Sequence, residues 1–289
     1  MTILDAIILG IVEGITEYLP VSSTGHLVLT SSLLGLDTGE SAAAVNALLI
    51  VMQGGAILAV LGLYWKRVQS MALGGLGRDP QGLRLLINIC IAFAPAPIVG
   101  ILLDDWIEAT LMKPVPVLIA LAGGGIVMIL IGKGRRKEGR DLDLWELAPS
   151  AALIIGLMQL LAMWPGVSRS MITIVAGMAV GLRPARAAEF SFLLGLPTLG
   201  GACVYKLGQN LMSDGPNLFE QLGWFNVLVG IIVATISAAI AVRWLVGYLN
   251  KHGLAVFGWY RIGLTILIGA LLMSGSITLS TTEAAPDMP

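Results

Sequence analysis

A short polar segment separates two apolar runs in the second half of the chain. It reads Trp164-Pro-Gly-Val-Ser-Arg-Ser-Met-Ile-Thr173. Pro165 and Gly166 are expected to end the preceding helix, and the next helix then starts with hydroxyl groups and one arginine: Ser168, Arg169, Ser170 and Thr173. Free N–H groups at a helix N-terminus, hydroxyl donors and a guanidinium together bind phosphate. The segment therefore predicts a phosphate site; the alternative is a kinked helix whose arginine pairs with a structural carboxylate.

Two carboxylates and a histidine lie in a second polar segment, near the N-terminus. Glu13 and Glu17 are four residues apart, so they share one face of a helix, which Pro20 should end. Such a pair suits a divalent cation or general acid–base chemistry. Alternatively, one carboxylate pairs with Arg169 and the other is a structural hydrogen-bonding group. The segment continues with three hydroxyl residues, a glycine and a histidine: Ser22, Ser23, Thr24, Gly25 and His26.

His26 is one of only 2 histidines in the chain. A histidine beside several hydroxyl groups can act as a nucleophile, as a general acid, or as a hydrogen-bonded anchor, and the sequence does not separate these roles. Arg261 is another ionisable residue within an apolar run. It either reaches the same cavity or extends its guanidinium to the membrane interface. Charges inside apolar segments are costly unless they face a partner or water, which makes them candidates for a functional site.

The composition indicates that these polar segments belong to a membrane protein. Of the 289 residues, 56% are hydrophobic and 12% are charged, and the mean hydropathy is +0.88. Soluble domains carry about 25% charged residues, so the chain is expected to cross a membrane several times. Helices are the expected spanning elements, because lipid cannot satisfy exposed backbone groups. The net charge of −1 gives no indication of nucleic-acid binding.

Both polar segments interrupt apolar runs that are short for a membrane span. The first pair of runs covers residues 3–19 and 27–36, and the second pair covers residues 147–163 and 171–182. A span needs about 20 apolar residues, so each pair is expected to form a re-entrant hairpin that lines a cavity. Full-length spans are predicted at residues 42–65, 85–103, 115–131, 187–205, 225–249 and 254–273.

The two halves of the chain match at an offset of 146 residues. The matching pieces are Ile8–Glu13 with Ile154–Gln159, Val21-Ser22 with Val167-Ser168, and Gly54-Gly55 with Gly200-Gly201. Three matches in one register indicate a duplicated unit, so we expect two repeats, residues 1–140 and 141–289. Each repeat holds one broken helix pair and three spans. Because three is odd, the second repeat must enter from the opposite side, and the expected fold is an all-α polytopic membrane protein with an inverted repeat.

The distribution of charge predicts how the chain is oriented. If the N-terminus is outside, the inner loops receive most of the arginine and lysine residues, including the basic cluster at residues 133–140. The outer loops then contain only Lys113 and Lys206 as basic residues. Because cytoplasmic loops carry an excess of lysine and arginine, both termini are expected on the outer side of the membrane.

Pseudo-symmetry would bring the two polar segments together near the middle of the bilayer. Carboxylates, a histidine, hydroxyl groups and an arginine would then share one site, which is the combination that phosphoryl transfer needs. The apolar walls suit a substrate with a lipid tail. A transporter or lipid flippase is the alternative, because inverted repeats with broken helices are common in transporters.

The two segments resemble the signature motifs of the undecaprenyl-pyrophosphate phosphatase family, also known as the bacitracin-resistance or BacA-type family. The motifs are Glu13-Gly-Ile-Thr-Glu17-Tyr-Leu-Pro-Val-Ser-Ser-Thr-Gly-His26 and Pro165-Gly-Val-Ser-Arg-Ser-Met-Ile-Thr173. Ala188-Glu-Phe-Ser-Phe-Leu-Leu and Tyr260-Arg261 also fit, so the resemblance covers essentially the whole chain. It implies a bacterial inner-membrane enzyme that removes the terminal phosphate of undecaprenyl pyrophosphate. The product, undecaprenyl phosphate, would re-enter peptidoglycan assembly, and the enzyme would give bacitracin resistance.

The resemblance further implies an active site that faces the outer side and depends on a divalent cation, Mg²⁺ or Ca²⁺. Together with the residue chemistry, it leads us to predict cation ligands at Glu13 and Glu17, and catalytic roles for Glu17, Ser23, His26 and Arg169. The nucleophile is His26, Ser23 or water. Predicted substrate contacts are Glu13, Ser22, Thr24, Gly166, Ser168, Ser170, Thr173 and Arg261. The expected partners are a polyprenyl pyrophosphate lipid and membrane lipids, and the sequence leaves a homodimer open.

Overall fold

The structure, a computed structural model, describes residues 1–36, 42–134, 142–212 and 216–274, and its regular elements there are all helices. The basic cluster at residues 133–140 lies largely outside these ranges, and so does the C-terminal tail from Ser274, which the sequence predicts to be a polar extension of the second repeat. The helices are α1 (Ile3–Tyr18), α2 (Ser23–Leu33), α3 (Ala42–Leu63), α4 (Trp65–Gly75), α5 (Pro80–Phe93), α6 (Pro95–Leu111), α7 (Pro114–Gly134), η1 (Leu144–Glu146), α8 (Pro149–Gln159), η2 (Leu160–Met163), α9 (Arg169–Ala179), α10 (Pro184–Met212), α11 (Leu218–Leu222), α12 (Trp224–Leu249) and α13 (Ala255–Met273).

Within the described residues, 6 helical segments are long and apolar enough to cross a membrane. They are Ala44–Leu63, Pro80–Leu103, Pro114–Gly132, Pro184–Met212, Trp224–Leu249 and Ala255–Met273. Each corresponds to one of the spans expected from the sequence, so the all-α, multi-pass membrane class is confirmed.

One predicted span is divided into two helices. The apolar run expected at residues 85–103 begins in α5, which ends at Phe93, and continues in α6, which starts at Pro95. Proline has no N–H to donate and its ring crowds the carbonyl of the preceding turn, so the helix is interrupted at Ala94. The apolar pattern alone did not reveal this break.

The two short helix pairs carry the polar segments. α1 begins at a capping box, in which the Thr2 hydroxyl accepts from the Asp5 amide and the Asp5 carboxylate accepts from the Thr2 amide. It ends at Tyr18, two residues before Pro20. α2 already begins at Ser23, so the hydroxyl-rich stretch forms its first turn rather than the loop that the sequence suggested.

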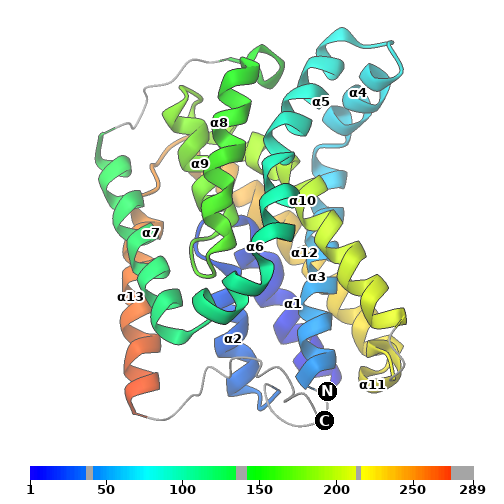
Figure 1. Cartoon of the computed structure of the whole chain (residues 1–289), viewed down its shortest axis with the longest axis vertical. Coiled ribbons are helices and arrows are strands. Elements are labelled where there is room, and N and C mark those ends of the chain that lie inside the picture. The colour runs from blue at the N-terminus through cyan, green and yellow to red at the C-terminus, as the bar shows by residue number, and fades with distance from the viewer. Residues whose placement is uncertain (37–41, 135–141, 213–215, 275–289) are drawn as a thin grey trace.

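α8 and η2 run to Met163, and α9 begins at Arg169 after the Pro165-Gly166 break. In Figure 1, α1 and α2 lie in the lower part of the molecule with Met1, whereas α8 and α9 lie in the upper part. The two pairs therefore approach the centre of the molecule from opposite ends, and α9 is deeply enclosed, since every residue from Ser170 to Met178 is buried.

Small residues let the helices that carry the site pack closely on their neighbours. α1 packs against α12, where Gly10 and Gly14 lie against the α12 backbone, and α8 packs against α5, where Gly156 lies against Ala92. α7 and α13 run side by side at the left of Figure 1. Helix contacts through small residues are typical of membrane bundles, and here they fix the helices that present the polar segments.

A network of charged side chains ties together the end of the bundle opposite Met1. Arg67 donates to Asp143 at 2.6 Å and to Glu189 at 3.0 Å, and Arg186 donates to Glu189 at 2.8 Å. The Arg67 guanidinium also lies 4.9 Å from the centre of the Trp145 ring. These contacts connect α4, the start of α10 and the segment before α8.

Candidate active site

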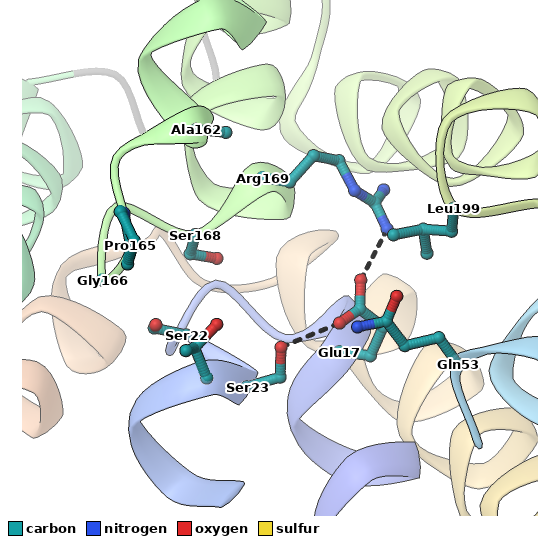
Figure 2. Close-up of a pocket in the computed structure, with 11 residues that line it drawn as sticks. Glu17, Ser22, Ser23, Gln53, Ala162, Pro165, Gly166, Ser168, Arg169 and Leu199 are labelled. Carbon is teal, nitrogen blue, oxygen red and sulfur yellow. Dashed lines mark hydrogen bonds and ion pairs between the residues drawn. The ribbon is translucent and has the colours of Figure 1, made fainter. Parts of the chain in front are cut away.

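The tips of the two short helix pairs enclose a cavity of about 140 Å³ (Figure 2). Four of its lining residues come from α1, the start of α2 and the residue before α2, and five come from η2, the start of α9 and the segment between them. Gln53 of α3 and Leu199 of α10 complete the lining. The full set is Glu17, Ser22, Ser23, Thr24, Gln53, Ala162, Pro165, Gly166, Ser168, Arg169 and Leu199. The structure therefore brings together the two polar segments that the sequence singled out, although about 140 residues separate them.

A chain of hydrogen bonds joins the two segments across this cavity. The Arg169 Nη2 donates to Glu17 Oε1 at 2.9 Å, and the Ser23 hydroxyl donates to Glu17 Oε2 at 2.8 Å. Both contacts are drawn as dashed lines in Figure 2. Only 6% of the Glu17 side chain and 11% of the Arg169 side chain are exposed. At this burial an ion pair is poorly screened, so the link between the segments is electrostatically strong.

The Arg169 side chain is held on three further sides. Its Nη1 donates to the Ser191 carbonyl at 3.0 Å, and the Tyr18 ring centre lies 5.5 Å from its guanidinium carbon. Gly195 faces the same guanidinium so closely that an added Cβ would meet Nη1 at 2.8 Å. A side chain at position 195 would therefore displace the Arg169 guanidinium. Because Gly195 of α10 has no side chain, it leaves room for this guanidinium in the site.

The hydroxyl groups at the start of α9 are divided between the cavity and the supporting structure. Ser168, the N-cap residue, lines the cavity and accepts from the Met171 amide at 3.3 Å. Ser170 donates to the Leu19 carbonyl at 2.9 Å, and Thr173 bonds to the Ser191 hydroxyl at 2.6 Å. Ser170 and Thr173 are 1% and 0% exposed, so in this structure they hold α9 against α1 and α10. Their predicted contact with substrate stays a prediction.

The backbone on both sides of the cavity is strained in the same way. Ser22 and Ser168, each directly before a helix, have φ angles of 72° and 74°, and they are the two non-glycine residues with positive φ in the described part of the chain. Gly166 has φ of 97°, and an added Cβ there would meet the Val117 carbonyl at 2.5 Å. Such conformations cost about 1–3 kcal/mol each and persist where the surroundings enforce them, which is typical of functional sites.

His26 points toward α13 and is not among the residues that line the described cavity. Its Nδ1 lies 2.7 Å from the Ser22 carbonyl oxygen, and its Nε2 lies 2.6 Å from the Tyr260 hydroxyl. Both ring nitrogens therefore have partners other than Ser23. Ser23 instead bonds to Glu17, which makes Glu17 the base within reach of that hydroxyl.

Arg261 is fully buried and does not reach a membrane interface, so the snorkelling alternative is wrong. Its guanidinium donates to four backbone carbonyls at 2.6–3.1 Å: Ala120, Leu121, Gly166 and Val167. The first two belong to α7 and the last two to the loop before α9. Arg261 thus fixes the loop that lines the cavity from behind, and its predicted substrate contact stays a prediction.

Glu13 is fully buried one helical turn before Glu17, and neither of its carboxylate oxygens has a hydrogen-bond partner among the described residues. Carboxylate oxygens of this kind suit Mg²⁺ or Ca²⁺. The described ranges contain no group of three or more His, Cys, Asp or Glu side chains that could hold a metal ion. A cation site would therefore rest on two carboxylates and on oxygens from substrate or water.

Comparison with known proteins shows the family of the chain. Residues 6–267 match the family described as bacitracin resistance protein BacA. The chain belongs to the BacA family. Curated relatives named undecaprenyl-diphosphatase come from Sorangium cellulosum, with 43% identity over 91% of this chain and 84% of the relative, and from Cereibacter sphaeroides, with 41% identity over 95% and 98%. A relative of that name from Deinococcus deserti is 40% identical over 93% of this chain and 95% of its own length.

Several residues of the site had no role in the sequence analysis. Gln53 lines the cavity, Tyr18 and Ser191 contact Arg169, and Tyr260 contacts His26. Gln53 and Asn46 are the two strongly polar residues in the apolar span at residues 42–65, and a polar side chain in such a span was a usable signal. Ser191 and Tyr260 lie within stretches that resemble BacA-family sequence, but nothing in their spacing indicates which distant residue they contact.

Proposed function

We propose that this protein hydrolyses undecaprenyl pyrophosphate to undecaprenyl phosphate and inorganic phosphate. The observation that carries the proposal is the Arg169–Glu17–Ser23 chain, which joins a cation, a carboxylate and a hydroxyl beside one cavity. Membership of the BacA family and about 40% identity to proteins named undecaprenyl-diphosphatase support the same substrate.

In the proposed reaction, the terminal phosphate takes the place of Glu17 as the partner of Arg169. The Arg169 guanidinium and the backbone N–H groups at the start of α9 then neutralise the phosphate oxygens, which is the largest contribution that a protein makes to such a transfer. Glu17, released from the ion pair, keeps its hydrogen bond to Ser23 and becomes available as a base. The resting ion pair thus holds both groups in place until substrate separates them.

The proposed nucleophile is the Ser23 hydroxyl. Its oxygen attacks the terminal phosphorus, its proton passes to Glu17 Oε2, and the bond from that phosphorus to the bridging oxygen breaks, releasing undecaprenyl phosphate. Water then attacks the phosphoserine and its proton passes to His26, which releases it to solvent, while Glu17 returns its proton to the Ser23 oxygen as phosphate leaves. This assignment follows from the hydrogen bond at 2.8 Å between Ser23 and Glu17, because hydrogen-bond reach is the first test of a catalytic base.

The donor set fits a divalent cation, which is the cofactor we propose, with Glu13 and Glu17 as its protein ligands. The carboxylate of Glu13 has no competing partner in the described chain. A bound Mg²⁺ or Ca²⁺ would offset the negative charge of the pyrophosphate oxygens. Without it, a buried carboxylate near Glu17 would repel an anionic substrate.

The proposed arrangement in the membrane is an inverted repeat, residues 1–140 and 141–289, in which each short helix pair is re-entrant. Several observations support it. α9 (Arg169–Ala179) follows α2 (Ser23–Leu33) at an offset of 146 residues at both ends, and the strained Ser22 and Ser168 keep that offset. α1 packs on α12 of the second half, and α8 packs on α5 of the first. We further propose a bacterial inner membrane location, with the cavity and both termini on the outer side.

The direct test is the release of inorganic phosphate from undecaprenyl pyrophosphate by purified protein in detergent, with and without chelator. Arg169→Ala, Glu17→Ala and Ser23→Ala should each lower the rate at least a hundredfold, since each removes a group that acts in the transition state. Arg243→Ala, which removes an exposed arginine of α12, should keep the wild-type rate. Near-normal turnover by the folded Arg169 variant would overturn the site assignment.

Two outcomes would change the proposed mechanism or function and would leave the location of the site unchanged. Near-normal turnover by Ser23→Ala would exclude a phosphoserine and leave direct attack by water. No phosphate release by folded wild type, together with movement of a labelled lipid across vesicles, would identify a transporter whose cavity binds lipid pyrophosphate.

A further inference from the structure

The imidazole of His26 is held from both sides by groups that fix where its proton lies. Nδ1 is 2.7 Å from the Ser22 carbonyl oxygen and Nε2 is 2.6 Å from the Tyr260 hydroxyl. A carbonyl oxygen only accepts hydrogen bonds, so Nδ1 must carry the proton. In the neutral ring Nε2 then holds a lone pair, and Tyr260 donates its hydroxyl proton to it.

The two rings also have a defined relative orientation. The planes of His26 and Tyr260 are within 2° of parallel, with centroids 5.6 Å apart. The lone pair of Nε2 lies in the plane of the imidazole, so the Tyr260 hydroxyl at hydrogen-bond distance from that nitrogen restricts the rotation of the ring, while the Ser22 carbonyl fixes its tautomer. Interactions that select a histidine tautomer in this way are a common means of preparing it for proton transfer.

We infer that Tyr260 positions His26 for the reaction and passes a proton to it. The Ser22 carbonyl keeps one proton on Nδ1, and the Tyr260 hydroxyl holds Nε2, the nitrogen that can receive a proton, in a fixed direction. Because the Tyr260 O–H occupies the single lone pair of Nε2, a proton reaches this nitrogen as Tyr260 passes on its own hydroxyl proton and takes up the one that the water releases. The Tyr260 oxygen then accepts from Nε2–H. The contact therefore survives both protonation states of His26. The inference rests on the proposed function, which supplies the reaction, whereas the contact between Tyr260 and His26 comes from the structure.

A purely structural role for the Tyr260 hydroxyl is not needed, because its neighbour already anchors α13. Arg261 donates four hydrogen bonds to α7 and to the loop before α9 and is fully buried. Tyr260 itself is 49% exposed. Arg261, the next residue of α13, therefore contacts the polar segment before α9, whereas Tyr260 contacts His26 in the polar segment near the N-terminus. Removing one hydroxyl should leave the helix in place.

The test is Tyr260→Phe, which deletes the hydroxyl and keeps the ring. We expect kcat for phosphate release to fall at least tenfold with KM within about twofold of wild type, because general acid–base catalysis contributes about 10²–10⁴-fold and depends on the correct protonation state. Tyr205→Phe is the matched control, since the Tyr205 hydroxyl accepts from Gln209 on the exposed part of α10. It should keep both constants.

A second readout does not depend on activity. The chain has only 2 histidines, His26 and His252, so nitrogen NMR of protein labelled with ¹⁵N-histidine gives two imidazoles, and His252→Gln assigns them. At alkaline pH, wild-type His26 should be in the single Nδ1–H tautomer. In Tyr260→Phe the Nε2 signal of His26 should move toward the position of a lone pair without a hydrogen bond, while Nδ1 stays protonated and the His252 signals stay unchanged.

Three results would overturn the inference: wild-type His26 protonated on Nε2, an unchanged His26 spectrum in the variant, or a changed spectrum with wild-type kcat. Failure of the proposed function looks different. In that case wild-type protein releases no phosphate, and the NMR result still reports whether the Tyr260 hydroxyl binds Nε2 of His26.

Discussion

At the residue scale, the site consists of side chains that reach the cavity and side chains that hold them there. Glu17, Ser23 and Arg169 form one hydrogen-bonded chain beside the cavity. Ser170 and Arg261 bond to backbone carbonyls behind it. Glu13 belongs to neither group, because its carboxylate is buried without a partner in the described chain. An isolated buried carboxylate is costly, so its presence is better explained by a ligand than by stability.

That argument gives a prediction for Glu13→Gln. Removing the buried charge should raise the thermal unfolding midpoint of the cation-free protein by a few degrees, while the rate of phosphate release falls at least tenfold. A residue whose replacement raises the stability of the protein and lowers its activity is usually a functional residue. Added Mg²⁺ or Ca²⁺ should raise the midpoint of wild type, because a ligand that binds only the folded state stabilises it. The midpoint of Glu13→Gln should not respond.

The matched control is Glu220→Gln, at an exposed position in α11 where glutamine can keep the capping-box bond. Thermal unfolding of this variant should respond to the cation as wild type does. An equal rise of the midpoint in wild type and in Glu13→Gln would exclude Glu13 from the cation site.

At the element scale, the helices that carry the site were largely predictable, and the exceptions have local causes. Pro20 marked the end of α1 within two residues, and every full-length span was found from its apolar pattern. α2 starts earlier than expected because contacts with other helices hold its first turn: Ser23 bonds to Glu17 of α1 and His26 bonds to Tyr260 of α13. The roles of Ser170 and Arg261 could not be predicted, since their partners are backbone carbonyls on other helices.

The contact between α1 and α12 positions both carboxylates and can be tested at Gly14. A Cβ at this position would overlap the Ala234 carbonyl and the Ser237 hydroxyl of α12. Gly14→Ala should therefore separate the two helices, lower the free energy of unfolding by about 1–3 kcal/mol, and reduce phosphate release, because Glu13 and Glu17 flank this position. Denaturant unfolding in detergent and the phosphate assay measure the two effects.

Gly247→Ala on α12 is the control, because no atom lies within 4 Å of the added Cβ. Alanine has the higher helix propensity by about 1 kcal/mol, so this variant should be at least as stable as wild type and fully active. Equal behaviour of Gly14→Ala and Gly247→Ala would show that α1 is not held by close packing on α12.

At the scale of the whole molecule, the two ends of the bundle differ in charge. The turn between α4 and α5, with Arg78, and the first turns of α5, with Arg84, lie at the end opposite Met1 and α11, as Figure 1 shows. Because loops rich in arginine and lysine stay in the cytoplasm, the α4–α5 turn should be inside and α11 outside. Length and hydropathy could locate the spans, but only the packed structure establishes that these two turns are at opposite ends.

Cysteine labelling can test this orientation. In a background where Cys90 and Cys203 are replaced by serine, Leu76→Cys and Gln221→Cys place one thiol at each end, at positions that are exposed. A membrane-impermeant maleimide should label Gln221→Cys in intact cells and Leu76→Cys only after permeabilisation. The reverse pattern would put the cavity on the cytoplasmic side and contradict a role at the outer face. Labelling of both thiols in intact cells would contradict the arrangement of the helices itself, because the α4–α5 turn and α11 would then share one side.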